Sequence, residues 1–208
     1  MLRNSRFFIL LIVFFTIPFY LQSQFLPGDI KPTTVKPRKS SDGLAGSGYA
    51  GLSLKAANTI NQWGLDVGAQ FGGMLSDRFG LGGAFYTLFT QNVRILPEQP
   101  YFLRLNYGGI EPRFVFKFGD FAVHTKLLIG LGFAGYSQNV NFDVLSDLDG
   151  DWIGISEPSV GLSYAVSENL WISFDAGWRI TGGVDFKNIT AEQLNGSFFT
   201  LTLKTFVF

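Results

Sequence analysis

Apolar and mixed side chains alternate along the chain from Gly48 to Phe208. Between residues 110 and 118, every even-numbered side chain is apolar, whereas the odd-numbered ones include Glu111, Arg113 and Lys117. Side chains point alternately to the two faces of a β-strand, while those of a helix repeat every 3.6 residues. The period of two therefore predicts an all-β domain, and no stretch of useful length shows a helical period.

Eight segments carry this alternation, and turn-forming residues flank each of them. Each segment therefore predicts one strand. The expected strands span residues 48–57, 63–75, 79–90, 103–118, 121–136, 152–165, 170–182 and 197–208. Eight strands are enough for a small closed barrel.

The connections between these strands alternate in length. Short connections are expected at 76–78, 119–120 and 167–169. Long connections are expected at 91–102, 137–151 and 183–196, with a shorter one at 58–62. Short periplasmic turns and longer outer loops are typical of bacterial outer-membrane barrels. The pattern places the N- and C-termini of the barrel domain at its short-turn, periplasmic end.

The mixed face indicates which way the side chains point. It carries glycines, which weaken a strand and need a steric reason: Gly68, Gly72, Gly80, Gly82, Gly130, Gly132, Gly161 and Gly177. An eight-stranded barrel is only wide enough inside for side chains, so long charged residues there require small neighbours. The apolar face then points to lipid, where only a closed sheet satisfies the backbone. We expect a closed, eight-stranded, antiparallel, up-and-down transmembrane barrel; the alternative is a soluble, lipocalin-like periplasmic carrier with its apolar face inside.

The N-terminal region has the composition of an export signal. Arg3 and Arg6 precede an apolar run from Phe7 to Leu21, which is short for a membrane-spanning helix, and Ser23 follows. We expect a cleaved signal peptide at 1–23, with an uncleaved anchor as the alternative. Residues 24–47, rich in Pro, Lys and Ser, predict a disordered periplasmic linker before the barrel at 48–208.

Charge and cysteine content exclude several classes of function. The chain has 16 basic and 16 acidic residues, so removal of Arg3 and Arg6 leaves 14 basic ones. Nucleic-acid binding needs clustered Lys and Arg, and the barrel region has no such cluster. The chain has no cysteine and therefore no thiol nucleophile or disulfide framework.

Charged residues on the inward face predict an ionic network inside the barrel. Arg113 and Lys126 are expected to lie opposite each other across a hairpin and to need a carboxylate. Glu157, which also lies near Arg179, is the first candidate, and Glu111 is the second. A narrow ion pathway or a proton-sensitive gate is the alternative. The full expected network is Lys55, Asp66, Glu111, Arg113, Lys117, His124, Lys126, Glu157, Asp175, Arg179 and Lys204.

The sequence predicts neither an enzyme nor a cofactor. His124 is the one histidine, and no motif places a serine nucleophile beside it. The acidic segment from Asp143 to Asp151 does not match the spacing of a calcium loop, so no metal site is expected beyond weak divalent binding.

Aromatic residues near strand ends are expected to form interfacial belts. They are Trp63, Tyr101, Phe102, Tyr107, Tyr136 and Trp152. At the C-terminus, the aromatic Phe206 and Phe208 share one parity, whereas the apolar Phe199, Leu201 and Leu203 have the opposite parity.

Three short stretches carry a family resemblance: Tyr107–Glu111 (YGGIE), Glu157–Gly161 (EPSVG) and Gly177–Arg179 (GWR). With these landmarks the chain resembles the small outer-membrane β-barrel superfamily of the OmpX and OmpW kind, and also a group of short Gram-negative barrels. The terminal Phe208 resembles the C-terminal aromatic that the barrel-assembly machinery reads, and Phe206 continues that pattern, so the resemblance implies an assembly signal at these two residues.

The resemblance implies that the protein lies in the outer membrane among its lipids, with the barrel-assembly machinery and an envelope protein as partners. The expected function is a non-enzymatic structural or interaction scaffold. The alternative is transport or binding of a small ligand, apolar ones included.

Overall fold

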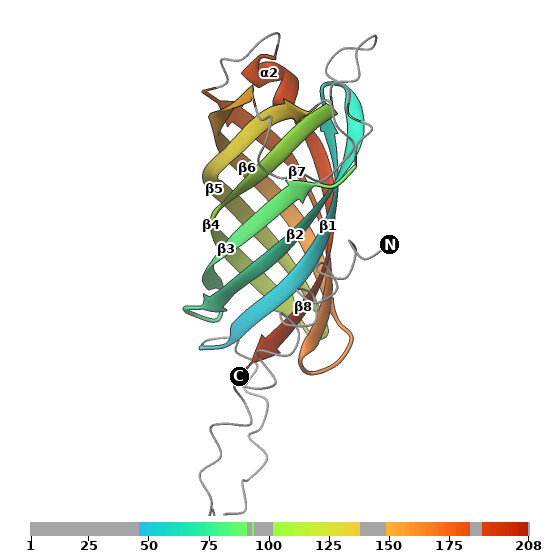
Figure 1. Ribbon diagram of the computed structural model, residues 1–208. Coiled ribbons are helices and arrows are strands. Elements are labelled where there is room, and N and C mark those ends of the chain that lie inside the picture. The colour runs from blue at the N-terminus through green and yellow to red at the C-terminus, as the bar shows by residue number, and fades with distance from the viewer. Residues whose placement is uncertain (1–45, 91–92, 94–101, 138–148, 184–188, 208) are drawn as a thin grey trace, which may run out of the picture. The chain divides into compact units, whose positions relative to one another are not determined.

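The structure, a computed structural model, describes residues 46–90, 93, 102–137, 149–183 and 189–207. These residues form eight antiparallel strands that close into a barrel (Figure 1). The elements are β1 (Gly48–Thr59), β2 (Gln62–Met74), β3 (Phe79–Leu88), β4 (Phe102–Phe118), β5 (Phe121–Ser137), β6 (Asp149–Ala165), β7 (Leu170–Gly182), the short helix α2 (Ala191–Leu194) and β8 (Gly196–Val207). The predicted fold class is confirmed, while the expected signal peptide and almost all of the expected linker lie outside the described residues.

Each strand pairs with its neighbour in sequence, and β1 also pairs with β8 to close the barrel. The closing register runs from Gly48 opposite Val207 to Ala57 opposite Phe198. A closed sheet leaves no strand edge, which a lipid environment requires.

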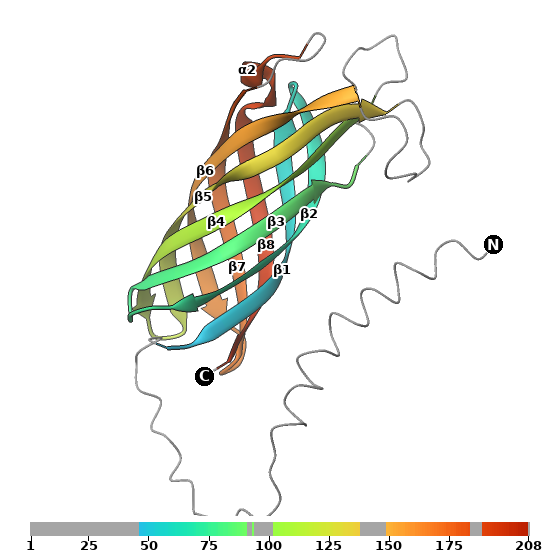
Figure 2. The same ribbon diagram turned by 60° about the vertical axis from the view of Figure 1, so that its left-hand side comes forward.

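The two ends of the barrel differ in their connections (Figures 1 and 2). At the turn end, residues 75–78, 119–120 and 166–169 join β2–β3, β4–β5 and β6–β7. At the opposite end, the loop end, lie the β1–β2 turn and α2. The β1–β2 connection at the loop end is a two-residue turn, in which Ile60 and Asn61 both have a φ of 54°.

The outer wall is apolar and the inner face is charged. Phe71, Leu131 and Trp152 expose 62%, 65% and 69% of their surface on the outside. Inside, Lys55, Asp66 and Arg179 expose 1% or less. This distribution is the reverse of a soluble carrier with a dry, apolar interior, so the lipocalin-like alternative is wrong. Among the described residues, no helix is long and apolar enough to cross a membrane.

Two apolar layers lie inside the barrel, one towards each end. The loop-end layer includes Val93, Leu103, Leu105, Leu128, Ile153, Ile155, Ile189 and Leu194. The turn-end layer consists of Tyr49, Met74, Val115, Ala122, Trp171 and Phe206. The buried charged residues lie between these layers.

The helix α2 was not expected from the sequence. It is one turn long, and Gln193 Oε1 accepts a hydrogen bond from the Thr190 N–H at 3.0 Å. Leu194 is fully buried in the loop-end layer, and Thr181 Oγ1 donates to the Ala191 carbonyl at 2.7 Å. The helix therefore carries an apolar side chain into the loop end of the barrel.

The belt expectation is wrong for Tyr107. Trp63 and Trp152 are exposed on the outer wall, but Tyr107 is 1% exposed and points inward. It has the odd parity of Glu111 and Arg113 on β4, and that parity faces the interior. Tyr101 and the side chain of Tyr136 lie outside the described part of the chain.

Glycine gives the interior charges the space they need, as the sequence predicted. At Gly161, an added Cβ would clash with Asp175 and would lie 2.7 Å from His124 Nε2. At Gly68, an added Cβ would clash with the Tyr86 ring. Any larger residue at these positions would displace an interior polar side chain.

Candidate functional site

The loop-end cluster consists of Lys55, Asp66, Tyr107, Glu157 and Arg179, all at most 2% exposed. Glu157 accepts from Lys55 Nζ at 2.6 Å and from Arg179 Nε at 2.8 Å, through its two carboxylate oxygens. Arg179 Nη2 also donates to Asp66 Oδ2 at 2.8 Å. Two cations therefore face two carboxylates, and every charge in the cluster has an opposite partner.

Tyr107 stands at the centre of the loop-end cluster. Its hydroxyl oxygen accepts from Lys55 Nζ at 3.1 Å and from Arg179 Nη2 at 2.5 Å. Glu157 Oε1 lies 3.0 Å away and Asp66 Oδ2 3.1 Å away as acceptors for its proton. Hydrogen bonds to charged groups are stronger than neutral ones, so this phenol helps to fix the geometry of all three ion pairs.

The turn-end cluster consists of Glu111, Arg113, His124, Lys126, Asp175 and Lys204, all at most 6% exposed. Glu111 pairs with Arg113 and lies 3.9 Å from Lys126 Nζ. Asp175 Oδ2 lies 3.0 Å from Lys126 Nζ, and Asp175 Oδ1 lies 2.5 Å from His124 Nε2. Among the described carboxylates, none lies within 4.0 Å of Lys204 Nζ.

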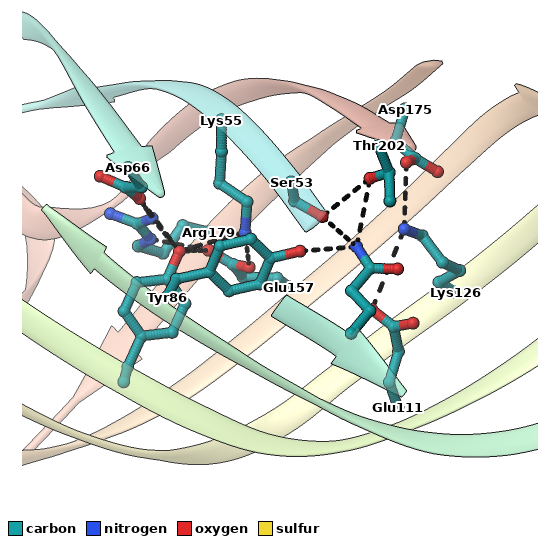
Figure 3. Close-up of polar contacts among 12 residues, drawn as sticks. Ser53, Lys55, Asp66, Tyr86, Glu111, Lys126, Glu157, Asp175, Arg179 and Thr202 are labelled. Atoms are coloured by element: carbon teal, nitrogen blue, oxygen red, sulfur yellow. Dashed lines mark hydrogen bonds and ion pairs between the residues drawn. The ribbon is translucent and has the colours of Figure 1, made fainter. Parts of the chain in front are cut away.

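Uncharged polar side chains connect the two clusters (Figure 3). Gln70 Nε2 donates to Tyr86 Oη at 2.8 Å and to Ser53 Oγ at 3.1 Å, and Ser53 Oγ lies 2.9 Å from Thr202 Oγ1. Lys55 Nζ lies 3.4 Å from the centroid of the Tyr86 ring, and Arg113 Nη2 donates to Gln70 Oε1 at 3.4 Å. The polar contacts therefore run through the lumen from the loop-end cluster to the turn-end cluster.

The expected partner of Arg113 and Lys126 is different in the structure. These two residues are opposite each other, as predicted. Glu111, the second candidate, binds Arg113 as expected, but Asp175 binds Lys126 in place of Glu157, the first candidate. Glu157 is opposite Leu128, two residues further along β5 than Lys126, and so lies closer to the loop end. Its pairing with Arg179 agrees with the expectation.

Lys117 is not part of either cluster, contrary to the expectation. It has the inward parity but is exposed, because it lies one residue from the end of β4, beyond Val115 of the turn-end layer. Its Nζ lies 5.9 Å from the centroid of the Trp171 ring.

A serine lies beside His124, which the sequence motifs did not indicate. Ser163 Oγ is 3.2 Å from His124 Nδ1 and 2.6 Å from Ser173 Oγ. Serine, imidazole and the Asp175 carboxylate thus form a hydrogen-bonded chain. Two signals were available in the sequence: the parity of β6 and the pairing of β5 with β6. Ser163 has the inward parity and is opposite Ala122, which is two residues from His124 on the same face of β5.

Burial limits the chemistry that the hydrogen-bonded Ser163, His124 and Asp175 side chains can perform. Ser163 is 5% exposed, and His124 and Asp175 are at most 2% exposed. A nucleophile needs a substrate within hydrogen-bonding reach, and these atoms are enclosed by the barrel wall and by neighbouring polar side chains. Within the described ranges, no group of three or more metal-binding side chains is arranged to hold an ion.

The C-terminal aromatic residues have one described side chain. Phe206 is 7% exposed and points inward, where its ring lies 5.9 Å from that of Tyr49 and 5.7 Å from that of Trp171. Phe208 lies outside the described residues. Phe206 is therefore a packing residue of the turn-end layer in the folded barrel.

Comparison with solved structures finds small outer-membrane barrels. Neisserial surface protein A (NspA) has 12% identity and a TM-score of 0.56, over 76% of this chain and 95% of that one. Ail, the attachment invasion locus protein of Yersinia pestis, has 13% identity and a TM-score of 0.47, over 77% and 97%. OprG from Pseudomonas aeruginosa has 10% identity and a TM-score of 0.41, over 79% and 96%.

No protein-family model matches the chain, and no curated protein matches it either. At these low identities the likeness to NspA shows the fold alone. The chain thus has the fold of the small eight-stranded outer-membrane barrels, as the resemblance of its landmarks implied.

Proposed function

We propose, from the outer-membrane barrel fold and the filled lumen, that this protein is a non-enzymatic scaffold of the cell envelope. Its apolar wall would contact outer-membrane lipids, and its loops would present a surface to an envelope protein partner. One observation carries the proposal: buried, hydrogen-bonded side chains occupy the lumen from the loop-end cluster to the turn-end cluster.

A pore needs a continuous path of water, and this interior has charged groups bound to one another instead. Lys55, Glu157 and Arg179 meet near the loop end, and Lys126 and Asp175 meet near the turn end. Buried ion pairs of this geometry are costly to break, because each partner would be left as an unpaired charge. An apolar layer lies on each side of these pairs.

Conductance in planar bilayers tests the scaffold against the transport alternative. The purified protein, reconstituted from detergent, should give no steady channels at high salt, while a water-filled porin handled in the same detergent should. Steady channels from the wild type would overturn the scaffold proposal and favour transport of a small solute.

The absence of catalysis is part of the proposal. Ser163, His124 and Asp175 are buried, so we expect no ester or phospholipid hydrolysis by the protein in mixed micelles. The measurement is release of fatty acid. Hydrolysis by the wild type that disappears in a Ser163→Ala variant would contradict a scaffold without chemistry.

We also propose that Phe206 and Phe208 act as a signal for the barrel-assembly machinery. Replacing Phe208 with serine should lower the amount of assembled barrel in cells and leave refolding of the purified chain in detergent unchanged, because detergent refolding needs no machinery. Equal cellular assembly of the variant and the wild type would remove Phe208 from the signal. Phe206→Leu is a less specific test, because Phe206 also packs against Tyr49 and Trp171.

A further inference from the structure

The turn-end cluster contains more positive than negative charge. Its cations are Arg113, Lys126 and Lys204, and its carboxylates are Glu111 and Asp175. Both carboxylates already bind Arg113, Lys126 and His124. Lys204 is 3% exposed, and no described carboxylate lies within 4.0 Å of its Nζ, so three buried cations share two carboxylates in this cluster.

Several donors of the same region also lack an acceptor. Within the described part of the chain, Arg113 Nε, Trp171 Nε1 and the Tyr49 hydroxyl are buried and make no hydrogen bond. Two of these atoms can only donate. Buried polar groups are nearly always paired, and an unpaired donor is costly. The missing partner is therefore an acceptor.

Two of these donors lie on the strands that pair with β8, which carries Lys204. Trp171 on β7 is directly opposite Lys204 on β8. Tyr49 on β1 is opposite Phe206, two residues from Lys204 on the same inward face. The guanidinium carbon of Arg113 lies 4.0 Å from the centroid of the Tyr49 ring. Trp171, Tyr49 and Lys204 thus occupy neighbouring inward positions at the turn end, and Arg113 reaches the Tyr49 ring from β4.

We propose that the turn-end cluster binds one small monovalent anion of the halide class. Lys204 supplies the counter-charge, and Trp171 Nε1, Arg113 Nε and the Tyr49 hydroxyl supply hydrogen bonds. An anion satisfies both the surplus charge and the unpaired donors, whereas a water molecule satisfies the donors and leaves the charge. The site is independent of whether the barrel acts as a scaffold.

Thermal unfolding of the purified protein in a neutral detergent tests the site. Chloride, bromide or nitrate would replace gluconate, a bulky organic anion, at constant ionic strength so that general screening stays fixed. Because a ligand that binds only the folded state stabilises it, the unfolding temperature of the wild type should rise and then saturate. No difference between chloride and gluconate would overturn the proposal.

Two substitutions locate the effect. Lys204→Met should abolish the dependence on chloride, while the matched Lys117→Met, which removes an exposed lysine, should retain it. Trp171→Phe removes one donor and should weaken chloride binding roughly tenfold. Equal chloride dependence of the Lys204→Met variant and the wild type would also overturn the site.

Diffraction from wild-type crystals grown in bromide provides a readout that does not depend on any variant folding. An anomalous peak is expected at hydrogen-bonding distance from Lys204 Nζ and Trp171 Nε1. A map with water alone at this position, or with bromide only on the protein surface, would refute the assignment.

Discussion

The loop-end and turn-end clusters lie in the same lumen but differ in how their charges are satisfied. In the loop-end cluster, Lys55 and Arg179 face Asp66 and Glu157, and Tyr107 bonds to all four. In the turn-end cluster, Lys204 has no described carboxylate partner. A buried charge stabilises a fold only when its partners are present. The same type of residue should therefore have different effects on stability at the two ends.

The largest effect is expected at Glu157, the carboxylate that joins two cations. Glu157→Ala leaves Lys55 and Arg179 without their shared partner, and we expect a loss of about 3–5 kcal/mol in the free energy of unfolding. Denaturant titration in detergent measures it. The control is Glu168→Ala at an exposed position of the β6–β7 turn, which should change little. Equal stability of both variants would mean that the loop-end cluster contributes nothing to the fold.

The comparison itself is tested by making one substitution at each end. Lys55→Met unpairs one oxygen of Glu157 and should cost about 3 kcal/mol or more. Lys204→Met removes a cation that has no described carboxylate within 4.0 Å, and in gluconate buffer the variant's free energy of unfolding should stay within about 1 kcal/mol of the wild type or exceed it. If Lys204→Met proves as destabilising as Lys55→Met, the charges of the two clusters do not differ in how well their partners satisfy them.

A smaller effect is expected where glycine gives space to the turn-end cluster. Gly161→Ala would push a methyl group against Asp175 and His124, and we expect a loss of about 1–3 kcal/mol. Gly182→Ala is the matched control, because an added Cβ there meets no atom within 4 Å. Unfolding midpoints that coincide for the two alanine variants would show that the His124–Asp175 pair can shift at no cost.

The smallest effect is expected at Ser163. Ser163→Ala removes hydrogen bonds to His124 and Ser173, worth about 1 kcal/mol in total. Ser156→Ala on the outer face of β6 is the control. A loss well above that of one or two neutral hydrogen bonds would indicate that Ser163 orients the whole turn-end cluster.

The strands were predictable because alternation is a local signal. The expected strand 170–182 has the bounds of β7. The expected connection at 119–120 is a two-residue turn, in which Gly119 adopts a φ of 60° that glycine accommodates without strain. β6 begins at Asp149 rather than at 152, because Asp149, Gly150 and Asp151 carry no apolar alternation. Helix α2 was missed because a single turn is too short to show a period.

The contacts inside the lumen were predictable only in part. Parity identifies which residues point inward, and ten of the eleven expected charges are buried there. It does not give the height at which a side chain on one strand meets a side chain across the barrel. For this reason Asp175, not the expected Glu157, binds Lys126. Lys117 was wrongly expected in the network because parity does not show how close to the end of its strand an inward residue lies.

The seam between β1 and β8 determines how the barrel assembles. Ser53 and Thr202, which bond across it, are 149 residues apart in sequence. Until that seam forms, the sheet has two open edges whose backbone groups have no partner in hydrocarbon, and the interior charges of β1 and β8 have no enclosing wall. Pairing of the seven sequence-neighbouring strand pairs therefore contributes little stability by itself. Closure between segments so far apart in sequence is slow. A barrel that lacks only its last strand should lose its fold as a whole rather than one eighth of its stability.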